Sequence, residues 1–222
     1  MPYFEPEFIS FFEELEKNNH RDWFHANKKR YETYVKNPFK LFVQDLIEGL
    51  NDMGDDIQMD AKDAIFRINR DIRFSKDKSP YKTQVSALIS AGGKKSMDHP
   101  GLYVEFKASE ASIYSGAYKL EKESLYSLRD HIASNPKEFT KLLKDKAFVD
   151  KFGEIRGEKN KRIPKEFAEA AESQPLLFNK SFYYFAKFPA KAIMEEGWKE
   201  TVLDYYAATK PMNEFLLAGL KK

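Results

Sequence analysis

The stretch that decides the fold reads Phe66-Arg67-Ile68-Asn69-Arg70-Asp71-Ile72-Arg73-Phe74-Ser75-Lys76-Asp77-Lys78-Ser79-Pro80-Tyr81-Lys82. Around its first half, from Ala64 to Phe74, apolar side chains fall on even positions, whereas residues 67, 69, 71 and 73 are polar. A period of two is typical of a half-buried β-strand, because successive side chains of a strand point to opposite faces. The sequence therefore predicts a strand over residues 64–74.

Further strands are expected on the C-terminal side of this stretch. Gly92-Gly93 and Lys107-Ala108-Ser109-Glu110 are turn signals between short segments rich in strand-forming residues. Short turns between consecutive strands favour antiparallel pairing of neighbours in the chain. The expected strands cover residues 85–91, 102–106, 112–115 and 182–188.

Helical spacing of apolar residues surrounds the strands. Phe8, Phe11, Phe12 and Leu15 share one face of a helix, and Asn19 is expected to cap the next one. Further helices are expected from Pro38 to about residue 50, over 120–132, over 136–146, and from 198 to 220 with a break at Pro211. Helices, then strands, then helices predict an α+β protein with a central antiparallel sheet, folded as a single domain over residues 1–222.

Composition narrows the class of protein. The chain has 222 residues, of which 42% are hydrophobic, and a formal net charge of only +2. It has no cysteine, which excludes disulfides, thiolate nucleophiles and zinc–thiolate sites. The histidines lack metal-ligand spacing and the glycines form no phosphate-binding signature, so we expect neither a metal nor a cofactor. With an acidic N-terminal segment and no apolar run of about 18 residues, a cytoplasmic location without a membrane partner is expected.

The quoted stretch is also the strongest candidate for a site. It places six basic residues against two acidic ones within seventeen positions, although acids and bases nearly balance in the whole chain. Clustered guanidinium and ammonium groups are what proteins use to hold phosphate or carboxylate groups. On the predicted strand, Arg67 and Arg73 would project from one face, which carries a side chain about every 6.6 Å. The sequence therefore predicts a site for an anionic small molecule.

Arg70 interrupts the alternation, because it stands where the buried face should be. A buried guanidinium needs a carboxylate or several carbonyls, since burying it unpaired is costly. Asp71 would lie on the opposite face, so Glu105 on a neighbouring strand is the better expected partner. An equally open interpretation is that the arginines form structural ion pairs, which imitate binding sites.

The segment from Ser75 to Pro80 is expected to form a charged loop beside the strand. Pro80 restricts the residue before it to extended geometry, and the loop has no apolar side to bury. Asp71 and Asp77 are the nearby candidates for a general base, and whether the protein is an enzyme stays open. A solvated charged turn without function is the alternative. The residues of this stretch expected to bind the ligand are Arg67, Arg70, Arg73, Ser75, Lys76, Lys78 and Lys82.

Several motifs together resemble one family. They are Asn18-Asn19-His20-Arg21-Asp22-Trp23-Phe24-His25-Ala26-Asn27-Lys28, the stretch 66–82, Pro100-Gly101-Leu102-Tyr103, Leu125 to Arg129, and Pro175 to Phe182. These segments resemble a widespread bacterial and fungal family known as domain of unknown function twenty-four sixty-one, and the match spans essentially the whole chain. The resemblance implies one stand-alone domain and no established activity, cofactor or partner. It adds Asn19, Arg21 and Trp23 to the candidate ligand-binding residues, beside the basic stretch.

Two classes of function follow from these observations. The first is a binder of an anionic small molecule, or an enzyme that acts on one. The second is a module that binds nucleic acid or an acidic protein, which the near-neutral net charge does not exclude. A pocket enclosing the arginines would favour the first, and a flat basic stripe the second.

Overall fold

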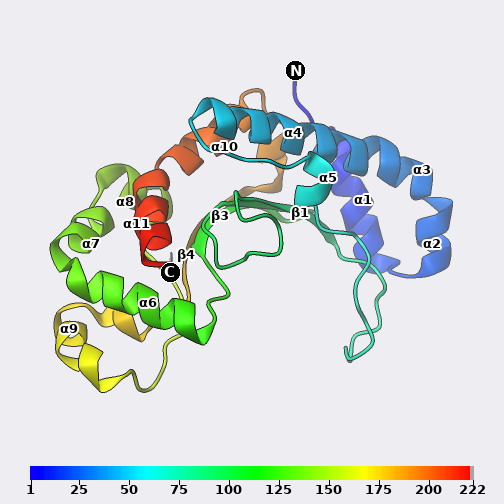
Figure 1. The fold of residues 1–222 in the computed structure, drawn as a ribbon. Coiled ribbons are helices and arrows are strands. Elements are labelled where there is room, and N and C mark those ends of the chain that lie inside the picture. Colours follow the sequence, from blue (N-terminus) through cyan, green and yellow to red (C-terminus); the bar gives the residue numbers. More distant parts are fainter. Residues whose placement is uncertain (221–222) are drawn as a thin grey trace. The chain divides into compact units, whose positions relative to one another are not determined.

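The computed structural model describes residues 1–220 and has the predicted α+β architecture (Figure 1). Its strands form one antiparallel sheet in the order β1-β2-β3-β4, so neighbours in the chain are neighbours in the sheet. The strands are β1 Gln84–Ile89, β2 Leu102–Lys107, β3 Glu110–Ala117 and β4 Phe182–Pro189. The fold class predicted from the alternation of periods is confirmed.

Helices precede and follow the strands as the apolar spacing predicted. Pro211 lies near the start of α11 and separates it from α10, as expected. The helices are α1 Pro6–Lys17, α2 Arg21–Ala26, α3 Lys28–Tyr31, α4 Asn37–Asp52, α5 Ala61–Ala64, α6 Lys122–Ser134, α7 Pro136–Leu143, α8 Lys146–Phe152, α9 Ala168–Ser173, α10 Trp198–Ala207 and α11 Lys210–Leu220. Short helical turns are η1 Glu32–Lys36, η2 Lys165–Phe167, η3 Pro175–Phe178 and η4 Ala190–Met194. No helix between residues 1 and 220 is long and apolar enough to cross a membrane.

The chain divides into two compact units. Unit 1 comprises Met1–Lys94, Tyr103–Ile113 and Lys187–Leu203. Unit 2 comprises Lys95–Leu102, Tyr114–Ala186 and the described residues from Asp204 onward. The predicted extent of one domain over residues 1–222 stays a prediction.

The core of unit 1 forms around Phe106 of β2, which is completely buried. Aromatic rings from the N-terminal segment, α4 and α10 surround it, with centroids 5.6 Å away for three of them and 6.1 Å for Trp198. Burial of such large side chains dominates core energetics, and the edge-to-face pairs add to it. The three closer rings are Phe4, Phe39 and Phe42.

The N-terminal helices of unit 1 run on from α3 into α4 through the π-helical turn η1. Pro38 lies in the first turn of α4, as predicted. The prediction that Asn19 caps α2 is wrong, because His20 is the cap and its Nδ1 accepts a hydrogen bond from the backbone N–H of Trp23 at 3.3 Å. The carboxamide of Asn19 instead binds a distant part of unit 1.

The prediction of a continuous strand over residues 64–74 is also wrong. Helix α5 extends to Ala64, and the following residues pair only through the isolated antiparallel bridges Ile65↔Ala87 and Asn69↔Tyr81. The second bridge folds the segment back on itself, so residues 65–82 form a narrow hairpin, drawn in teal in Figure 1. A continuous ladder fails here because Pro80 has no N–H and the charged side chains leave no apolar face to bury. We call residues 65–82 the basic hairpin.

Unit 2 packs the C-terminal helices against β3 and β4. Tyr184 of β4 is completely buried, with its ring 4.8 Å from that of Phe148 and 5.4 Å from that of Phe152 in α8. Its hydroxyl donates a hydrogen bond to Asn213 of α11. The sheet in this unit is therefore held to the helices by both aromatic packing and a buried polar contact.

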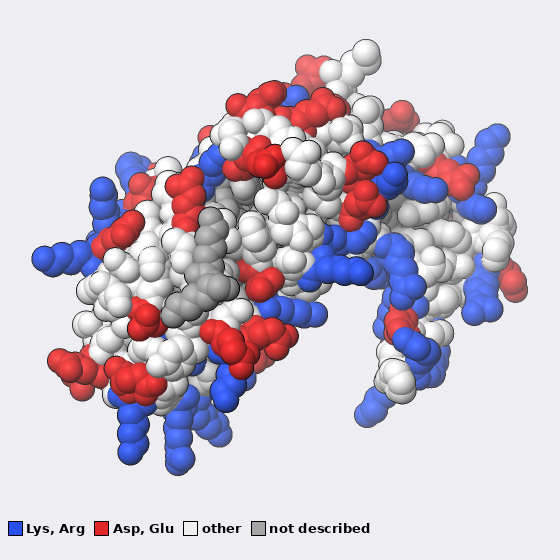
Figure 2. All heavy atoms as spheres, viewed as in Figure 1, with Lys and Arg blue, Asp and Glu red and all other residues white. Residues whose placement is uncertain are grey.

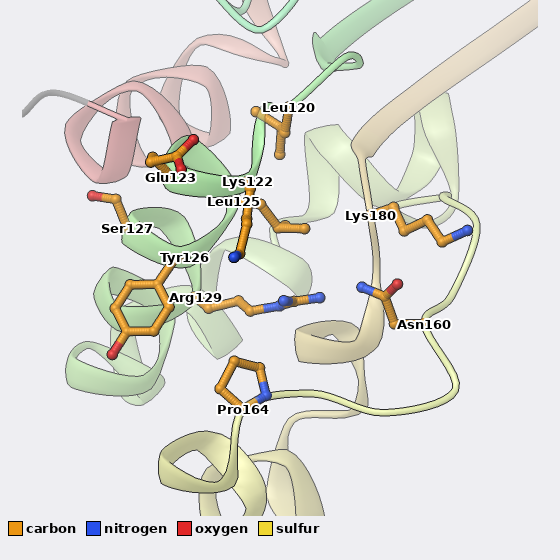
Figure 3. Close-up of a pocket in the computed structure, with 10 residues that line it drawn as sticks. All are labelled: Leu120, Lys122, Glu123, Leu125, Tyr126, Ser127, Arg129, Asn160, Pro164 and Lys180. Carbon is orange, nitrogen blue, oxygen red and sulfur yellow. The ribbon is translucent and has the colours of Figure 1, made fainter.

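Unit 2 also contains a cavity of about 690 Å³ beside α6 (Figure 3). The cavity is lined by residues of α6, by residues of the connection between α8 and η2, and by Lys180 near the start of β4. Its size is within the range of small-molecule pockets.

Candidate anion-binding site

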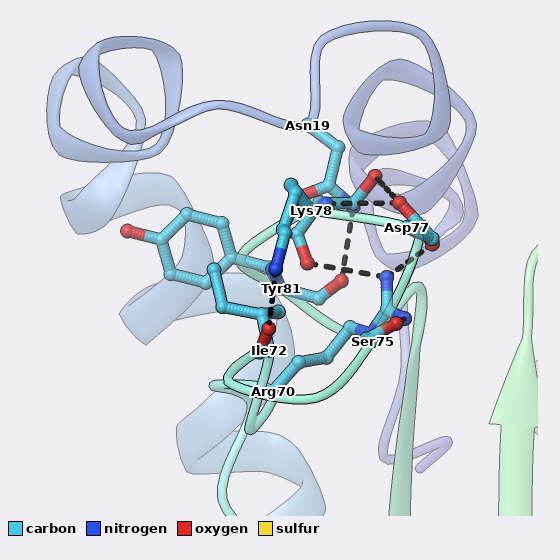
Figure 4. A network of polar contacts seen from close by, with 8 residues as sticks. Asn19, Arg70, Ile72, Ser75, Asp77, Lys78 and Tyr81 are labelled. Carbon is cyan, nitrogen blue, oxygen red and sulfur yellow. Dashed lines mark hydrogen bonds and ion pairs between the residues drawn. The ribbon is translucent and has the colours of Figure 1, made fainter.

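Asn19 anchors the basic hairpin to the helices of unit 1 (Figure 4). Its Nδ2 donates to the carbonyl of Tyr81 at 2.9 Å, and its Oδ1 accepts from the backbone N–H of Tyr81 at 3.1 Å. The Tyr81 ring stacks on Phe24 with centroids 4.0 Å apart. The carboxamide thus satisfies both backbone groups of one residue, as a neighbouring strand would.

The other two residues that the family resemblance added lie beside this anchor. Arg21 is exposed at the start of α2. Trp23 is partly buried against Phe11, with ring centroids 5.6 Å apart. Only Asn19 of the three has a hydrogen bond to the hairpin among residues 1–220.

Arg70 organises the loop of the hairpin (Figure 4). Its Nη1 donates to Asp77 and to the carbonyl of Ser79 at 3.1 Å, and its Nη2 lies 3.5 Å from the hydroxyl of Ser75. The prediction that this guanidinium pairs with a carboxylate and a carbonyl is confirmed, but the expected partner Glu105 is wrong. The side chain keeps 28% of its surface exposed, because the hairpin has no second layer to cover it.

Asp77 is committed to holding the loop. Its Oδ1 accepts from the backbone N–H of Ser79 at 2.9 Å and from the Ser79 hydroxyl at 2.7 Å. These hydrogen bonds and then Arg70 lower the pKa of Asp77 from 3.8 to about 2. A general base works best with a pKa near the operating pH, so this carboxylate is a poor base at neutral pH.

The lowered pKa predicts how the loop responds to acid. Because folding lowers the pKa of Asp77, its ionised carboxylate stabilises the folded state at pH values above the ordinary pKa of 3.8. This contribution is lost as the pH falls through about 2. We expect the Asp77 carboxyl to titrate near 2 in an NMR experiment that follows its carbon resonance, with the Ser79 amide resonance moving at the same pH. In Ser79→Ala the midpoint should move upward, and a wild-type midpoint near 3.8 would contradict the hydrogen-bonded geometry.

The tip of the hairpin carries its own counter-ions. Arg73 forms an exposed ion pair with Asp71 at 2.7 Å, which lowers the pKa of the Asp71 carboxyl. The Lys78 ammonium donates to the carbonyl of Ile72 at 3.1 Å, and Lys76 is exposed. Two of the cations predicted to bind the anion, Arg73 and Lys78, are therefore engaged within the hairpin.

The base of the hairpin is different, because cations gather there without matching carboxylates. The ammonium groups of Lys82 and Lys94 lie 5.5 Å and 5.6 Å from the centroid of the same ring, Phe66. Lys94 also donates to the carbonyl of Ile65 at 2.7 Å, which holds it against the hairpin. Figure 2 shows Lys and Arg side chains gathered along the hairpin and at its upper end in this view.

The acid nearest to these cations is already neutralised. Glu105 is buried, forms an ion pair with Lys107 at 2.8 Å, and accepts hydrogen bonds from Tyr103 and Gln84. Lys82 is half-buried and has no ion pair or hydrogen bond from its ammonium among residues 1–220. Burial lowers its pKa, and so do Arg67 and Lys94, whereas Glu105 opposes the shift.

The base of the hairpin therefore brings together residues that were predicted to bind an anion and residues that were not. Arg67 is exposed and Lys82 is half-buried, and Lys94 and Phe66, which were not among the predicted site residues, lie beside Lys82. Lys94 follows the turn signal Gly92-Gly93, and only the antiparallel register Ile65↔Ala87 brings this turn back to the hairpin. Residues 1–220 contain no cluster of three or more acidic or histidine side chains that could hold a metal ion.

A family model described as conserved hypothetical protein (DUF2461) matches residues 7–215 of this chain. A comparison with curated proteins finds no match.

Proposed function

Because this chain belongs to the family of conserved hypothetical proteins DUF2461, whose description names no activity, we propose its function from the site itself. The protein binds an anionic small molecule, bearing phosphate or carboxylate groups, at the base of the basic hairpin. Arg67, Lys82 and Lys94 hold the anion, and Phe66 forms the apolar floor beneath the two ammonium groups.

The observation that carries the proposal is the half-buried ammonium of Lys82, whose nearest charged neighbours are mainly cations. Like charges at short range repel, and this repulsion is screened less at a half-buried position than in open solvent. A bound anion would remove this repulsion and restore the pKa of Lys82 toward its ordinary value. The proposal is one of binding rather than catalysis, because Asp71 and Asp77 are both engaged by arginines.

The test is a thermal-shift screen of the full chain against inorganic phosphate, sugar phosphates, nucleotides and citrate at constant ionic strength. A ligand that binds the native state raises the melting temperature, by an amount that grows with the logarithm of its concentration relative to Kd. We expect at least one anion to do so, and Lys82→Met to weaken its binding about tenfold or more, as loss of a charge-assisted hydrogen bond does.

Lys76→Met is the matched control, since it removes an exposed ammonium from the same hairpin. It should leave anion binding nearly unchanged. Without ligand, Lys82→Met should melt at the same temperature as the wild type or higher, because it removes an uncompensated charge. A lower melting temperature together with unchanged anion binding would overturn the proposal in favour of a structural role.

A specific observation favours one second candidate, a module that binds single-stranded nucleic acid. Phe74 at the tip of the hairpin is 95% exposed, and the Arg73 guanidinium lies 5.8 Å from its ring centroid. Exposed aromatic rings beside basic side chains are what single-strand binders use to stack bases and hold phosphates. This alternative would be favoured by salt-sensitive binding of an oligonucleotide, if Phe74→Ala weakens the binding and Lys82→Met does not.

The cytoplasmic location stays a prediction.

A further inference from the structure

Arg129 of α6 is a buried cation in unit 2 that the proposed function does not use. It keeps only 5% of its surface exposed and lines the cavity of about 690 Å³. Its Nε donates to the carbonyl of Leu177 at 2.8 Å, and its Nη2 donates to the carbonyl of Asn179 at 3.2 Å. Both acceptors are neutral, and no carboxylate pairs with Arg129 among residues 1–220.

A buried guanidinium without a carboxylate is unusual, since buried charges in proteins are normally paired. The two carbonyls hold the Nε and Nη2 groups, whereas the Nη1 group has no acceptor among residues 1–220. In Figure 3 the guanidinium extends past Leu125 and Pro164 toward Asn160. The carboxamide of Asn160 likewise has no hydrogen bond among residues 1–220, although its backbone N–H donates to Phe178.

The rest of the cavity determines what kind of ligand fits. Leu120, Leu125, Tyr126 and Pro164 make much of its wall apolar. Of the other cations at its edge, Lys180 pairs with Glu158 at 3.3 Å, and Lys122 is exposed to solvent, which screens its charge. A single buried guanidinium in an apolar pocket suits one negative charge on an apolar body.

We infer that the cavity beside α6 binds an amphipathic monocarboxylate, with its carboxylate on Arg129 and Asn160 and its apolar chain against Leu125 and Pro164. A carboxylate presents two oxygens to the guanidinium plane, and its single charge matches the single buried cation of the cavity. A phosphate dianion would call for a second unbalanced cation, which the buried part of this cavity does not provide among residues 1–220. The site is independent of the basic hairpin, since all of its residues belong to unit 2.

The experiment uses the full chain, with octanoate as the probe and octanol as the matched neutral molecule. We expect octanoate to bind saturably in calorimetry and to shift the Arg129 Nε–H resonance in a nitrogen–proton NMR spectrum. Octanol should bind about tenfold or more weakly, because it lacks the charge that the guanidinium recognises.

Leu125→Trp is the variant that keeps Arg129 and fills the cavity, and it should abolish octanoate binding while circular dichroism shows an unchanged fold. Arg129→Met removes the cation, and this variant is informative only if it folds, because it also loses the two carbonyl contacts. Asp130→Asn, an exposed change next to Arg129, is the control that should bind as the wild type does. Lys82→Met should bind octanoate normally, so failure at one site is distinguishable from failure at the other.

Absence of octanoate binding to the wild type, equal binding of octanol, or full binding to Leu125→Trp would each overturn the inference. A shift of the Arg129 resonance by inorganic phosphate but not by octanoate would overturn the choice of a carboxylate on an apolar body.

Discussion

Gly116→Ala is expected to lower the free energy of unfolding by about 3 kcal/mol or more. Gly116 lies in β3 with φ of 97°, a conformation that residues with a side chain rarely adopt. A methyl group at this position would also lie 2.2 Å from the carbonyl oxygen of Phe182 in β4. This oxygen belongs to the backbone of the neighbouring strand, so no side-chain rotation relieves the contact.

Gly54→Ala is the matched control, because Gly54 has φ of 89° and its added methyl group would meet nothing within 4 Å. It should cost only about 1 kcal/mol, which is the strain of the backbone alone. Urea denaturation followed by circular dichroism measures both variants. Equal losses in the two would show that β4 does not approach Gly116 as closely as the structure has it.

Asn213→Leu is expected to destabilise the protein by about 3 kcal/mol, through a buried polar network of unit 2. The Asn213 Nδ2 group donates to the Ser115 hydroxyl at 2.9 Å and to the Thr209 hydroxyl at 3.0 Å. Its Oδ1 accepts from the hydroxyl of the completely buried Tyr184. Leucine has a similar volume, so the loss comes mainly from the Tyr184 hydroxyl, which loses its acceptor. The Ser115 and Thr209 hydroxyls lose the Asn213 donor but keep their backbone acceptors.

A double-mutant cycle with Tyr184→Phe isolates this cause. Phenylalanine at 184 has no hydroxyl to satisfy, so Asn213→Leu should cost about 1 kcal/mol less in that background. Denaturant titration of the four proteins gives the coupling. A cost that is the same in both backgrounds would show that the Tyr184–Asn213 hydrogen bond contributes nothing to stability.

Much of the fold was predictable because it depends on local patterns. The apolar spacing of Phe8, Phe11 and Phe12 predicted α1, and Pro211 predicted the break between the last two helices. Alternation was less reliable, since a period of two describes a strand in a sheet and an arm of a hairpin equally well. Residues 64–74 have that period, yet only Ile65 at their start bridges to β1, and the loop closed by Arg70 and Asp77 turns the rest back on itself.

The candidate sites were only partly predictable because they depend on contacts between residues distant in the sequence. The pairing of Arg70 was predictable from the cost of burying a guanidinium, but its partner Asp77 depended on how the loop closes. Lys94 reaches the hairpin only through the pairing register of β1. The burial of Arg129 could not be predicted from the sequence, because an arginine on an amphipathic helix is usually exposed to solvent.

The π-helical turn Glu32–Lys36 between α3 and α4 has a consequence for how related chains can vary. Such a turn accommodates one extra residue, and each residue of an α-helix rotates the chain by about 100°. Deleting a single residue there would restore regular winding and rotate α2, together with Asn19 just before it, around the axis of α4. An insertion or deletion of one residue in this turn would thus move Asn19 relative to the basic hairpin, although Asn19 and Tyr81 themselves stay unchanged in the sequence.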